Sequence, residues 1–378
     1  MSRLSQSRRP ISTKIHSAKA AINLRLVVFI TVTYIIAVLF VTLADYLLLK
    51  PFEQFVTFSH TTNLVINLVA AVIAGLAVGS FEVFYLKNRF RKRSFGQVLL
   101  IKSGFYIGAI FCITVVLTFF AQAITKQRHL FDPDVIAGVM AFFGGTGVWL
   151  VFLQWGFIIV FTLFLLQVND MFGQGVLFNF LLGRYHRPRE ERRIFMFLDM
   201  KSSTSIAEKI GHIQYYELLN DFFFDLTDPI ILSLGEVYQY VGDEIVVSWR
   251  WDNGVRDANC MECFFRCQDA IHAKASYYQG KYGVVPEFKA GIHSGKVAVG
   301  EVGVIKKEIV FTGDVLNASS RIHDTCKEYG EDLLVSREVL ESLDMAGAGY
   351  NSEKIGVIDL RGRHEAISLF SVTRPDRH

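Results

Sequence analysis

Two acidic residues, and an amide spaced four positions from a guanidinium, are the side chains of this sequence best suited to chemistry. Asp199 ends the apolar stretch FMFLD, and Asp243 stands in the tight turn of YVGDE. Two carboxylates that converge bind Mg²⁺ well, and a nearby helix N-terminus adds amide groups for phosphate. Asn317 and Arg321 lie in NASSR and would share one face of a helix. An amide there suits a ribose, and a guanidinium suits a phosphate.

Each feature also has a plainer interpretation when it is taken alone. An aspartate at a strand end is commonly a helix cap, Gly-Asp in a hairpin is commonly only a turn, and an Asn–Arg pair is commonly a surface hydrogen bond. The residues after Asp199 favour a functional interpretation, because they open a predicted helix whose backbone N–H groups would face phosphate oxygens. These expected phosphate-binding residues are Lys201, Ser202, Ser203 and Thr204.

The elements that must position these residues are predicted from Arg192 onward. The sequence predicts a strand, a helix, a hairpin, a helix, three strands and a last helix, over residues 192–200, 203–226, 235–241 with 244–251, 256–278, 288–295, 296–303, 308–312 and 314–329. The βαββαβ order is typical of an α+β, ferredoxin-like fold. In such a sheet the first strand and the hairpin are neighbours, so Asp199 and Asp243 would converge on one edge.

The first half of the chain has the composition of a membrane domain. Hydrophobic residues make up 51% of the sequence and charged residues only 20%, and the mean hydropathy is +0.33. The apolar residues concentrate in four runs, each longer than the roughly 20 residues that cross a bilayer as a helix. The expected spans are Leu24–Leu49, Thr61–Leu86, Phe95–Ala123 and Gly144–Val168.

Basic residues beside these runs predict the orientation in the membrane. They concentrate in the N-terminal tail, in KNRFRKR at residues 87–93, and in the segment of residues 184–193. The positive-inside rule therefore places both termini and the second half of the chain in the cytoplasm, at the inner membrane of a cell. The net charge is only +3 and the basic residues form no stripe of their own, so no nucleic-acid partner is expected.

The predicted domains are a basic tail at residues 1–23, the four-span domain at 24–168, a connector at 169–191, and the catalytic domain at 192–374. The connector has apolar residues at helical spacing and is expected to form a short amphipathic helix below the membrane. Two interpretations of it stay open. It is either a solvated tether or an element that passes a membrane signal to the catalytic domain.

The apolar half of the sequence also contains glycines and charged residues that have more than one interpretation. Gly75 and Gly79 form a GxxxG motif, which indicates either a helix-packing face, within one subunit or between two, or ordinary small-residue packing. Asp45, Glu82 and Lys102 lie near the span ends, where solvation at the interface explains them. No charge deep in the spans indicates a transporter.

The cysteines form no regular framework, which fits a reducing compartment. Cys260, Cys263 and Cys267 are clustered on a predicted helix without a second pair of ligands, so packing is favoured over zinc binding. His293, in AGIHSG, is interpreted as a structural histidine.

Four motifs occur together in order: FLDMKSST, YVGDE, FKAGIHSGKVAVG and GDVLNASSR. The segment from Arg192 to about Val372 resembles the class III adenylate/guanylate cyclase catalytic domain on these motifs. With its four spans and the connector FGQGVLFNFLLGRYHRPREE, the whole chain resembles membrane cyclases of the Bacteroidetes type.

The resemblance implies a role for each of the matched residues. Asp199 and Asp243 would bind two Mg²⁺ or Mn²⁺ ions at each site, which activate the ribose 3′-hydroxyl and neutralise the phosphates. Asn317 would orient the ribose, and Arg321 would stabilise charge on the α-phosphate. The reaction would be attack of the 3′-oxygen on the α-phosphorus, with pyrophosphate leaving.

Two further implications concern the terminal phosphates and the assembly. Arg361 falls where the family has a basic residue for the terminal phosphates, with Arg363 as its rival. In this family the metal aspartates and the Asn/Arg pair of one site come from different subunits. One chain here holds both sets, so the resemblance implies a head-to-tail homodimer with two equivalent sites.

The base-selecting positions match neither of the two family patterns. Adenylate cyclases often have Lys with Asp or Thr, and guanylate cyclases have Glu with Cys, whereas the corresponding positions here are Gln239 and Val310. ATP is favoured because adenylate cyclases are common and because the Glu that would pair with guanine is missing.

The alternatives left open are a guanylate cyclase and a catalytically silent receptor that binds nucleotide and dimerises. A diguanylate cyclase is disfavoured, since its doubled hairpin glycine is absent and it has no counterpart of the N-x3-R helix.

Overall fold

The computed structural model describes residues 11–49, 60–86, 89–90, 93–172, 182–343, 349–359 and 366–374. The chain divides into two compact units, residues 1–172 and 173–378. Most of the predicted connector helix lies at residues 173–181, outside the described residues, while Asn169 still belongs to the last helix of the first unit.

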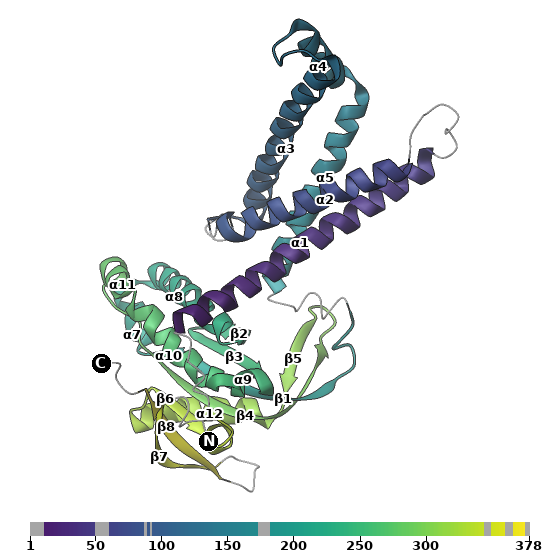
Figure 1. Cartoon of the computed structure of the whole chain (residues 1–378). Coiled ribbons are helices and arrows are strands. Elements are labelled where there is room, and N and C mark those ends of the chain that lie inside the picture. The colour runs from purple at the N-terminus through teal and green to yellow at the C-terminus, as the bar shows by residue number, and fades with distance from the viewer. Residues whose placement is uncertain are drawn as a thin grey trace, which may run out of the picture. The chain divides into compact units, whose positions relative to one another are not determined.

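The described elements of the first unit are all helices, with short turns between some of them (Figure 1). Its elements are α1 (Ile11–Leu49), α2 (His60–Phe81), a π-turn η2 (Glu82–Leu86) that continues α2, α3 (Phe95–Lys126), α4 (Pro133–Gly144) and α5 (Thr146–Phe172). Within the described residues, three stretches are long and apolar enough to cross a membrane, at Asn23–Ala44, Phe95–Ile124 and Phe152–Asn169. The second expected span is helical too, although its apolar stretch Ala71–Leu86 is shorter.

Helix α4 is an element that the sequence patterns did not predict. Pro133 stands at its first turn, and the Asp132 side chain accepts a hydrogen bond of 2.9 Å from the Asp134 backbone N–H. Such a cap and an N-terminal proline start a helix even where the apolar run is short. Helix α1 also begins at Ile11, so helical structure extends into the segment that was expected to be a polar tail.

The GxxxG motif of α2 packs against α1 within this chain. A Cβ atom built on Gly75 would lie 2.7 Å from the Cα of Thr31, and one on Gly79 would lie 3.3 Å from the Cα of Val27. Only glycine allows two helix backbones to approach so closely. The motif therefore serves helix packing inside one subunit.

The interpretation of Glu82 and Lys102 as interfacial residues is wrong. Glu82 on η2 and Lys102 on α3 form an ion pair, and they are only 8% and 7% exposed. The Tyr106 hydroxyl donates to the second Glu82 oxygen at 3.0 Å. Proximity to a span end suggested solvation, but the two charges face each other across neighbouring helices and are satisfied there.

The second unit is built on one eight-stranded sheet. Its strands are β1 (Arg189–Met200), β2 (Glu236–Val241), β3 (Glu244–Arg250), β4 (Phe288–Val302), β5 (Glu308–Thr312), β6 (Leu333–Ser336), β7 (Asn351–Ile358) and β8 (Ile367–Thr373). Their order is β2-β3-β1-β4-β6-β8-β7, with β5 paired to β4. The first four strands form the antiparallel ferredoxin-like order that was expected. The two strands predicted at 288–303 are one continuous strand, β4.

The helices of this unit are α7 (Ser203–Ile210), α8 (His212–Leu232), α9 (Trp251–Val255), the 3₁₀ turn η3 (Arg256–Ala258), α10 (Asn259–His272), α11 (Ala275–Tyr282), α12 (Asp314–Tyr329) and α13 (Arg337–Leu340). The helix expected over 203–226 is broken at Gly211, whose φ of +81° ends α7. The helix expected over 256–278 is likewise divided into η3, α10 and α11. Helix α12 has the bounds that were predicted.

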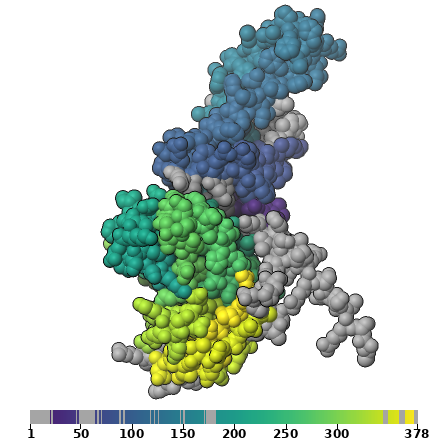
Figure 2. All heavy atoms as spheres, turned by 90° about the vertical axis from the view of Figure 1, so that its left-hand side faces the viewer, coloured from purple at the N-terminus to yellow at the C-terminus, as the bar shows by residue number. Residues whose placement is uncertain are grey.

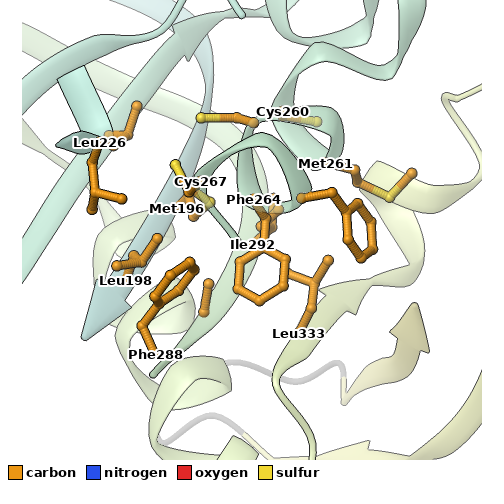
Figure 3. Packing of buried hydrophobic residues seen from close by; sticks show 14 of the residues in the cluster. Met196, Leu198, Leu226, Cys260, Met261, Phe264, Cys267, Phe288, Ile292 and Leu333 are labelled. Carbon is orange, nitrogen blue, oxygen red and sulfur yellow. The ribbon is translucent and has the colours of Figure 1, made fainter. Parts of the chain in front are cut away.

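The main core lies between the sheet and helices α8 and α10 (Figure 3). Met196 and Leu198 of β1 and Phe288 of β4 pack there against Phe264 of α10. All three clustered cysteines, Cys260, Cys263 and Cys267, are fully buried in this core. Their role in packing, expected from the sequence, is confirmed by that burial.

Helices α8 and α11 adjoin on the surface of this unit (Figure 2). Their contact is a network of tyrosine, lysine and aspartate side chains. Lys274 pairs with Asp225 at 2.6 Å, Tyr278 donates to Asp225 at 2.8 Å, and Lys281 pairs with Asp221 at 2.9 Å. These bonds hold the middle of α8 against α11 and the residue before it.

Helix α12 packs on the opposite face of the sheet. Alternate β1 residues, Phe195 and Phe197, face it together with Val297 of β4 and Val315 of α12. A Cβ atom on Gly291 would lie 2.3 Å from the His323 backbone nitrogen, so this glycine permits the close approach of α12. Side chains alternate along a strand, and Asp199 therefore lies on this α12 face of the sheet.

Candidate active site

Asp199 lies at the end of β1, where three strands bring polar side chains to one place. It is opposite Glu244 of β3 and opposite Lys289 of β4 in the sheet register. Antiparallel partners point to the same side of a sheet, so all three side chains share the α12 face. The Asp199 side chain is 23% exposed, which leaves it open to a ligand.

Asp243 is placed by the two-residue turn between β2 and β3. Gly242 has a φ of +65°, and such a tight hairpin turn needs a positive φ at its first central residue. The carboxyl groups of Asp243 and Asp199 are close enough to share a hydrogen bond. The structure thus brings together the two carboxylates that the sequence singled out.

The electrostatics of this acidic cluster favour a cation. Burial, followed by the neighbouring Asp243, raises the pKa of Asp199 to about 7. Burial, followed by Asp324 and Asp243, raises the pKa of Glu244 to about 7. Carboxylates that repel each other in a partly buried site are relieved by a divalent ion, and carboxylate oxygens are the ligands that Mg²⁺ prefers. Asp199 and Asp243 therefore fit a metal whose other ligands are phosphate oxygens and water.

The expected phosphate-binding segment opens helix α7. Ser202 has a φ of +56° and its carbonyl accepts the Ile206 N–H at 3.0 Å, which leaves the amides of the first turn directed outward. Lys201 is engaged elsewhere, since its backbone N–H donates to Glu287 at 2.8 Å and its ammonium pairs with Asp332. The amides at Ser203 and Thr204 are better placed for an anion than Lys201 is.

Tyr215, near the start of α8, is a site residue that the sequence analysis missed. Its hydroxyl is hydrogen-bonded to Ser203 and is close to Asp243. Burial raises the pKa of Tyr215, so the phenol is neutral and available as a donor. No motif marks this position, because only the break at Gly211 turns α8 back toward Asp199 and Asp243.

Asn317 and Arg321 lie on the exposed face of α12. The Arg321 guanidinium reaches only the Asp359 carbonyl, at 3.5 Å. Among the described residues, neither side chain is hydrogen-bonded or ion-paired to Asp199 or Asp243. The two halves of the expected site are therefore both formed, but one chain does not join them.

Gln239 and Val310, the expected base-selecting residues, lie on two strands that approach each other. Gln239 is exposed beside an irregularity of β2, and Val310 is half-buried in β5. Their neighbours Tyr238 and Phe311 pack with ring centroids 5.0 Å apart, and the Phe311 N–H donates to the Tyr238 hydroxyl at 3.4 Å. Residues 361 and 363, the two arginines considered for the terminal phosphates, lie outside the described residues.

The second half of the chain matches a known protein family and several of its members. Residues 186–372 match the adenylate and guanylate cyclase catalytic domain. Adenylate cyclase 2 of Rhizobium meliloti is 34% identical over 211 residues, which cover 56% of this chain and 58% of that protein. An adenylate cyclase of Anabaena cylindrica is 29% identical over 190 residues, covering 48% of this chain and 36% of that one. Retinal guanylyl cyclase 2 of Bos taurus is 30% identical over 172 residues, covering 44% and 15%.

A solved structure of a bacterial light-regulated adenylyl cyclase is 18% identical, with a TM-score of 0.48 over 54% of this chain and 60% of that one. The structure defines the class of domain as an α+β sheet with two neighbouring carboxylates, Asp199 and Asp243, at one end. More narrowly, the family match and the relatives support a class III adenylate/guanylate cyclase catalytic domain at residues 186–372. The chain spans a little over half the length of the Rhizobium relative.

Proposed function

We propose that this protein is a membrane-bound adenylate cyclase that converts ATP to cyclic AMP and pyrophosphate. One observation carries the proposal: the fold brings Asp199 and Asp243 together at the end of β1, inside a domain that matches the cyclase family. The two relatives named first above are both adenylate cyclases.

In the proposed mechanism, the residues of one protomer hold the triphosphate end of the substrate. Asp199 and Asp243 hold Mg²⁺ or Mn²⁺, two ions at each site. When bound, the ions polarise the ribose 3′-hydroxyl and neutralise charge on the phosphates. The amides of Ser203 and Thr204 at the start of α7 bind phosphate oxygens, and Tyr215 holds the Ser203 side chain in place. Arg361 is proposed to contact the terminal phosphates.

The residues of the other half-site are proposed to come from a second copy of the chain. Asn317 orients the ribose, and Arg321 stabilises the charge that develops on the α-phosphate during in-line attack. The exposure of both side chains on α12 supports this arrangement, because they are free to reach a partner. A head-to-tail homodimer would then contain two equivalent composite sites.

ATP is proposed as the substrate, with GTP as the alternative. Gln239 is exposed on β2, where its amide could meet the edge of a base, while Val310 offers only shape. The guanylate cyclase alternative stays open because retinal guanylyl cyclase 2 also matches the domain.

The membrane domain is proposed to span the inner membrane four times, with both termini and the catalytic domain in the cytoplasm. Three long apolar helices and the basic segments that flank them support this topology. A relationship to Bacteroidetes-type membrane cyclases is proposed on the combination of four spans and connector.

The test is to incubate the purified full-length chain, in detergent, with Mn²⁺ and either ATP or GTP, and to identify the product by mass. Cyclic AMP from ATP, absent in Asp199→Ala, is the expected result. Cyclic GMP from GTP without cyclic AMP would favour the guanylate cyclase. Binding of the triphosphates without turnover would favour a silent receptor.

A further inference from the structure

His323 belongs to α12 and lies on the side of this helix that packs against the sheet, beside Asp199 at the end of β1. It is 4% exposed, and its Nε2 atom is 3.9 Å from the Oδ2 atom of Asp199. Its Nδ1 atom is 3.8 Å from Glu244 Oε2 and 3.5 Å from Asp324 Oδ1. The imidazole is therefore surrounded by carboxylates on both of its nitrogen atoms.

The Nε2 atom of His323 is buried and has no hydrogen-bond partner in the described part of the chain. Leaving a polar atom unpaired in a protein interior is costly, and such atoms are rare in native structures. A leucine would fill the same space without this cost. The polar group that Nε2 faces is the Asp199 carboxyl, which is the proposed metal ligand.

We propose that His323 is a positioning residue that holds Asp199 in the orientation needed to bind the metal ion, an inference that rests on the proposed function. In this role the imidazole, as the tautomer that carries its proton on Nε2, would donate to one Asp199 oxygen and leave the other oxygen for the cation. Carboxylates that bind metal ions are commonly held in this way by outer hydrogen bonds. The two atoms are 3.9 Å apart, and hydrogen bonds of this kind commonly shorten once a site is filled, so a bound cation would let this contact tighten.

The position of His323 on α12 gives the inference a sharp consequence. The same helix presents Arg321 on its exposed face, and in the proposed dimer Arg321 serves the partner's metal site. One helix would therefore contribute to both sites of the dimer. If His323 acts through Asp199, its effect belongs to the site that contains its own subunit's aspartates, and not to the site that contains its own subunit's Arg321.

A binding experiment without catalysis tests the contact itself. The full-length chain in detergent is titrated with Mn²⁺ in the presence of 3′-deoxy-ATP, which lacks the attacking hydroxyl. Gln carries its amide nitrogen about as far out as Nε2, and Asn reaches only about as far as Nδ1. His323→Leu and His323→Asn should raise the Mn²⁺ concentration at half-saturation by about 10-fold or more, and His323→Gln should retain most of the affinity. Equal affinity in all three variants and the wild type would overturn the inference.

A second buried histidine supplies the matched control. His293 is 1% exposed on the same face of the sheet, but its Nδ1 bonds to Ser336 at 2.8 Å. His293→Gln should lower the melting temperature and leave the Mn²⁺ half-saturation unchanged. A loss of Mn²⁺ affinity that simply follows the melting temperature across all variants would show a general structural role and would contradict the proposal.

Mixed dimers determine which site His323 serves. A dimer of Asp199→Ala with Arg321→Ala retains one composite site, built from the aspartates of the Arg321→Ala chain. His323→Leu added to the Arg321→Ala chain should weaken that site for Mn²⁺, while the same change in the Asp199→Ala chain should not. The reverse pattern would overturn the inference and leave the proposed function intact. An inactive wild type would instead refute the proposed function.

Discussion

The carboxyl groups of Asp199 and Asp243 are neighbours within hydrogen-bonding reach, although they come from the end of one strand and from the turn of a hairpin. Their proximity makes this acidic cluster unfavourable when both carboxyl groups are ionised.

The first prediction concerns the stability of the metal-free protein. The pKa of Asp199 is about 7 in the fold and near 4 in an unfolded chain, so between these values the folded state binds more protons. Stability therefore falls as pH rises from about 4 to 7, and the cost is fully present above pH 7. Asp199→Asn removes this cost and should stabilise the protein at pH 8 by on the order of 2 kcal/mol, and by much less at pH 5.

Thermal unfolding in excess chelator at the two pH values measures this difference. Asp252→Asn, at an exposed position of α9, is the control and should change little at either pH. A gain for Asp199→Asn that is equal at pH 5 and pH 8 would contradict the raised pKa.

The second prediction concerns half-site complementation. Asp199→Ala and Arg321→Ala should each be inactive, because each homodimer lacks one part of both sites. Equal mixing should restore about a quarter of the wild-type activity, since half of the dimers are mixed and each has one intact site of two. A mixture of Asn317→Ala with Arg321→Ala should stay inactive, because both residues belong to the same half-site. Lack of recovery in a mixture shown to contain mixed dimers would refute the two-subunit site.

The third prediction concerns the choice of base. Gln239→Glu combined with Val310→Cys introduces the pair expected from the resemblance to guanylate cyclases. We expect the ratio of activity with ATP to activity with GTP to fall by about 10-fold, which corresponds to one hydrogen-bonded contact exchanged for another. Initial rates with both nucleotides measure the ratio. An unchanged ratio would show that these two positions do not contact the base.

The fourth prediction concerns the Glu82–Lys102 ion pair of the helical first unit. Glu82→Leu leaves Lys102 buried without its partner and should destabilise the protein by about 3 kcal/mol. The double variant Glu82→Leu with Lys102→Leu should recover much of this loss, because a buried pair replaced by apolar residues leaves no charge unpaired. Thermal unfolding in detergent compares the wild type, Glu82→Leu, Lys102→Leu and the double variant. Additive effects of the two single changes would mean that the residues do not interact.

The fifth prediction concerns the packing of α2 on α1. Gly75→Ala places a Cβ atom 2.7 Å from the Cα of Thr31 and should destabilise the protein by about 1–3 kcal/mol. Gly104→Ala in α3 is the control, since nothing lies within 4 Å of its Cβ position. That change should be neutral or mildly stabilising, by up to about 1 kcal/mol, because alanine is the better helix former. Equal losses at the two glycines would contradict the close packing.

Much of the catalytic unit could be predicted from sequence patterns, because local rules determine it. The hairpin turn at Gly242, strand β5 and both ends of α12 lie where the patterns placed them. The convergence of Asp199 with Asp243 followed from the expected strand order. Periodicity and turn chemistry are local properties, and they were sufficient for these features.

Features that depend on packing between distant segments could not be predicted. From the sequence, Glu82 and Lys102 were interpreted as interfacial charges. Their pairing depends on how η2 and α3 are rotated about their axes relative to each other, and no local pattern encodes that rotation. His323 follows Arg321 by two positions and carries no motif of its own, so its place beside Asp199 depends on the close approach of α12 at Gly291. Helix α4 was missed because its apolar run is short.

The π-turn η2 sets the angle between two contacts of a single helical rod. Before the turn, the glycine stripe of α2 faces α1, and at the turn Glu82 faces α3. A π-turn holds one residue more than an α-helix of the same length. Deleting one residue from Glu82–Leu86 would restore a regular helix and rotate one side against the other by about 100°. Gly75 and Gly79 could then no longer pack against α1 while Glu82 pairs with Lys102 of α3. The number of residues in Glu82–Leu86 therefore matters for packing, whatever their types.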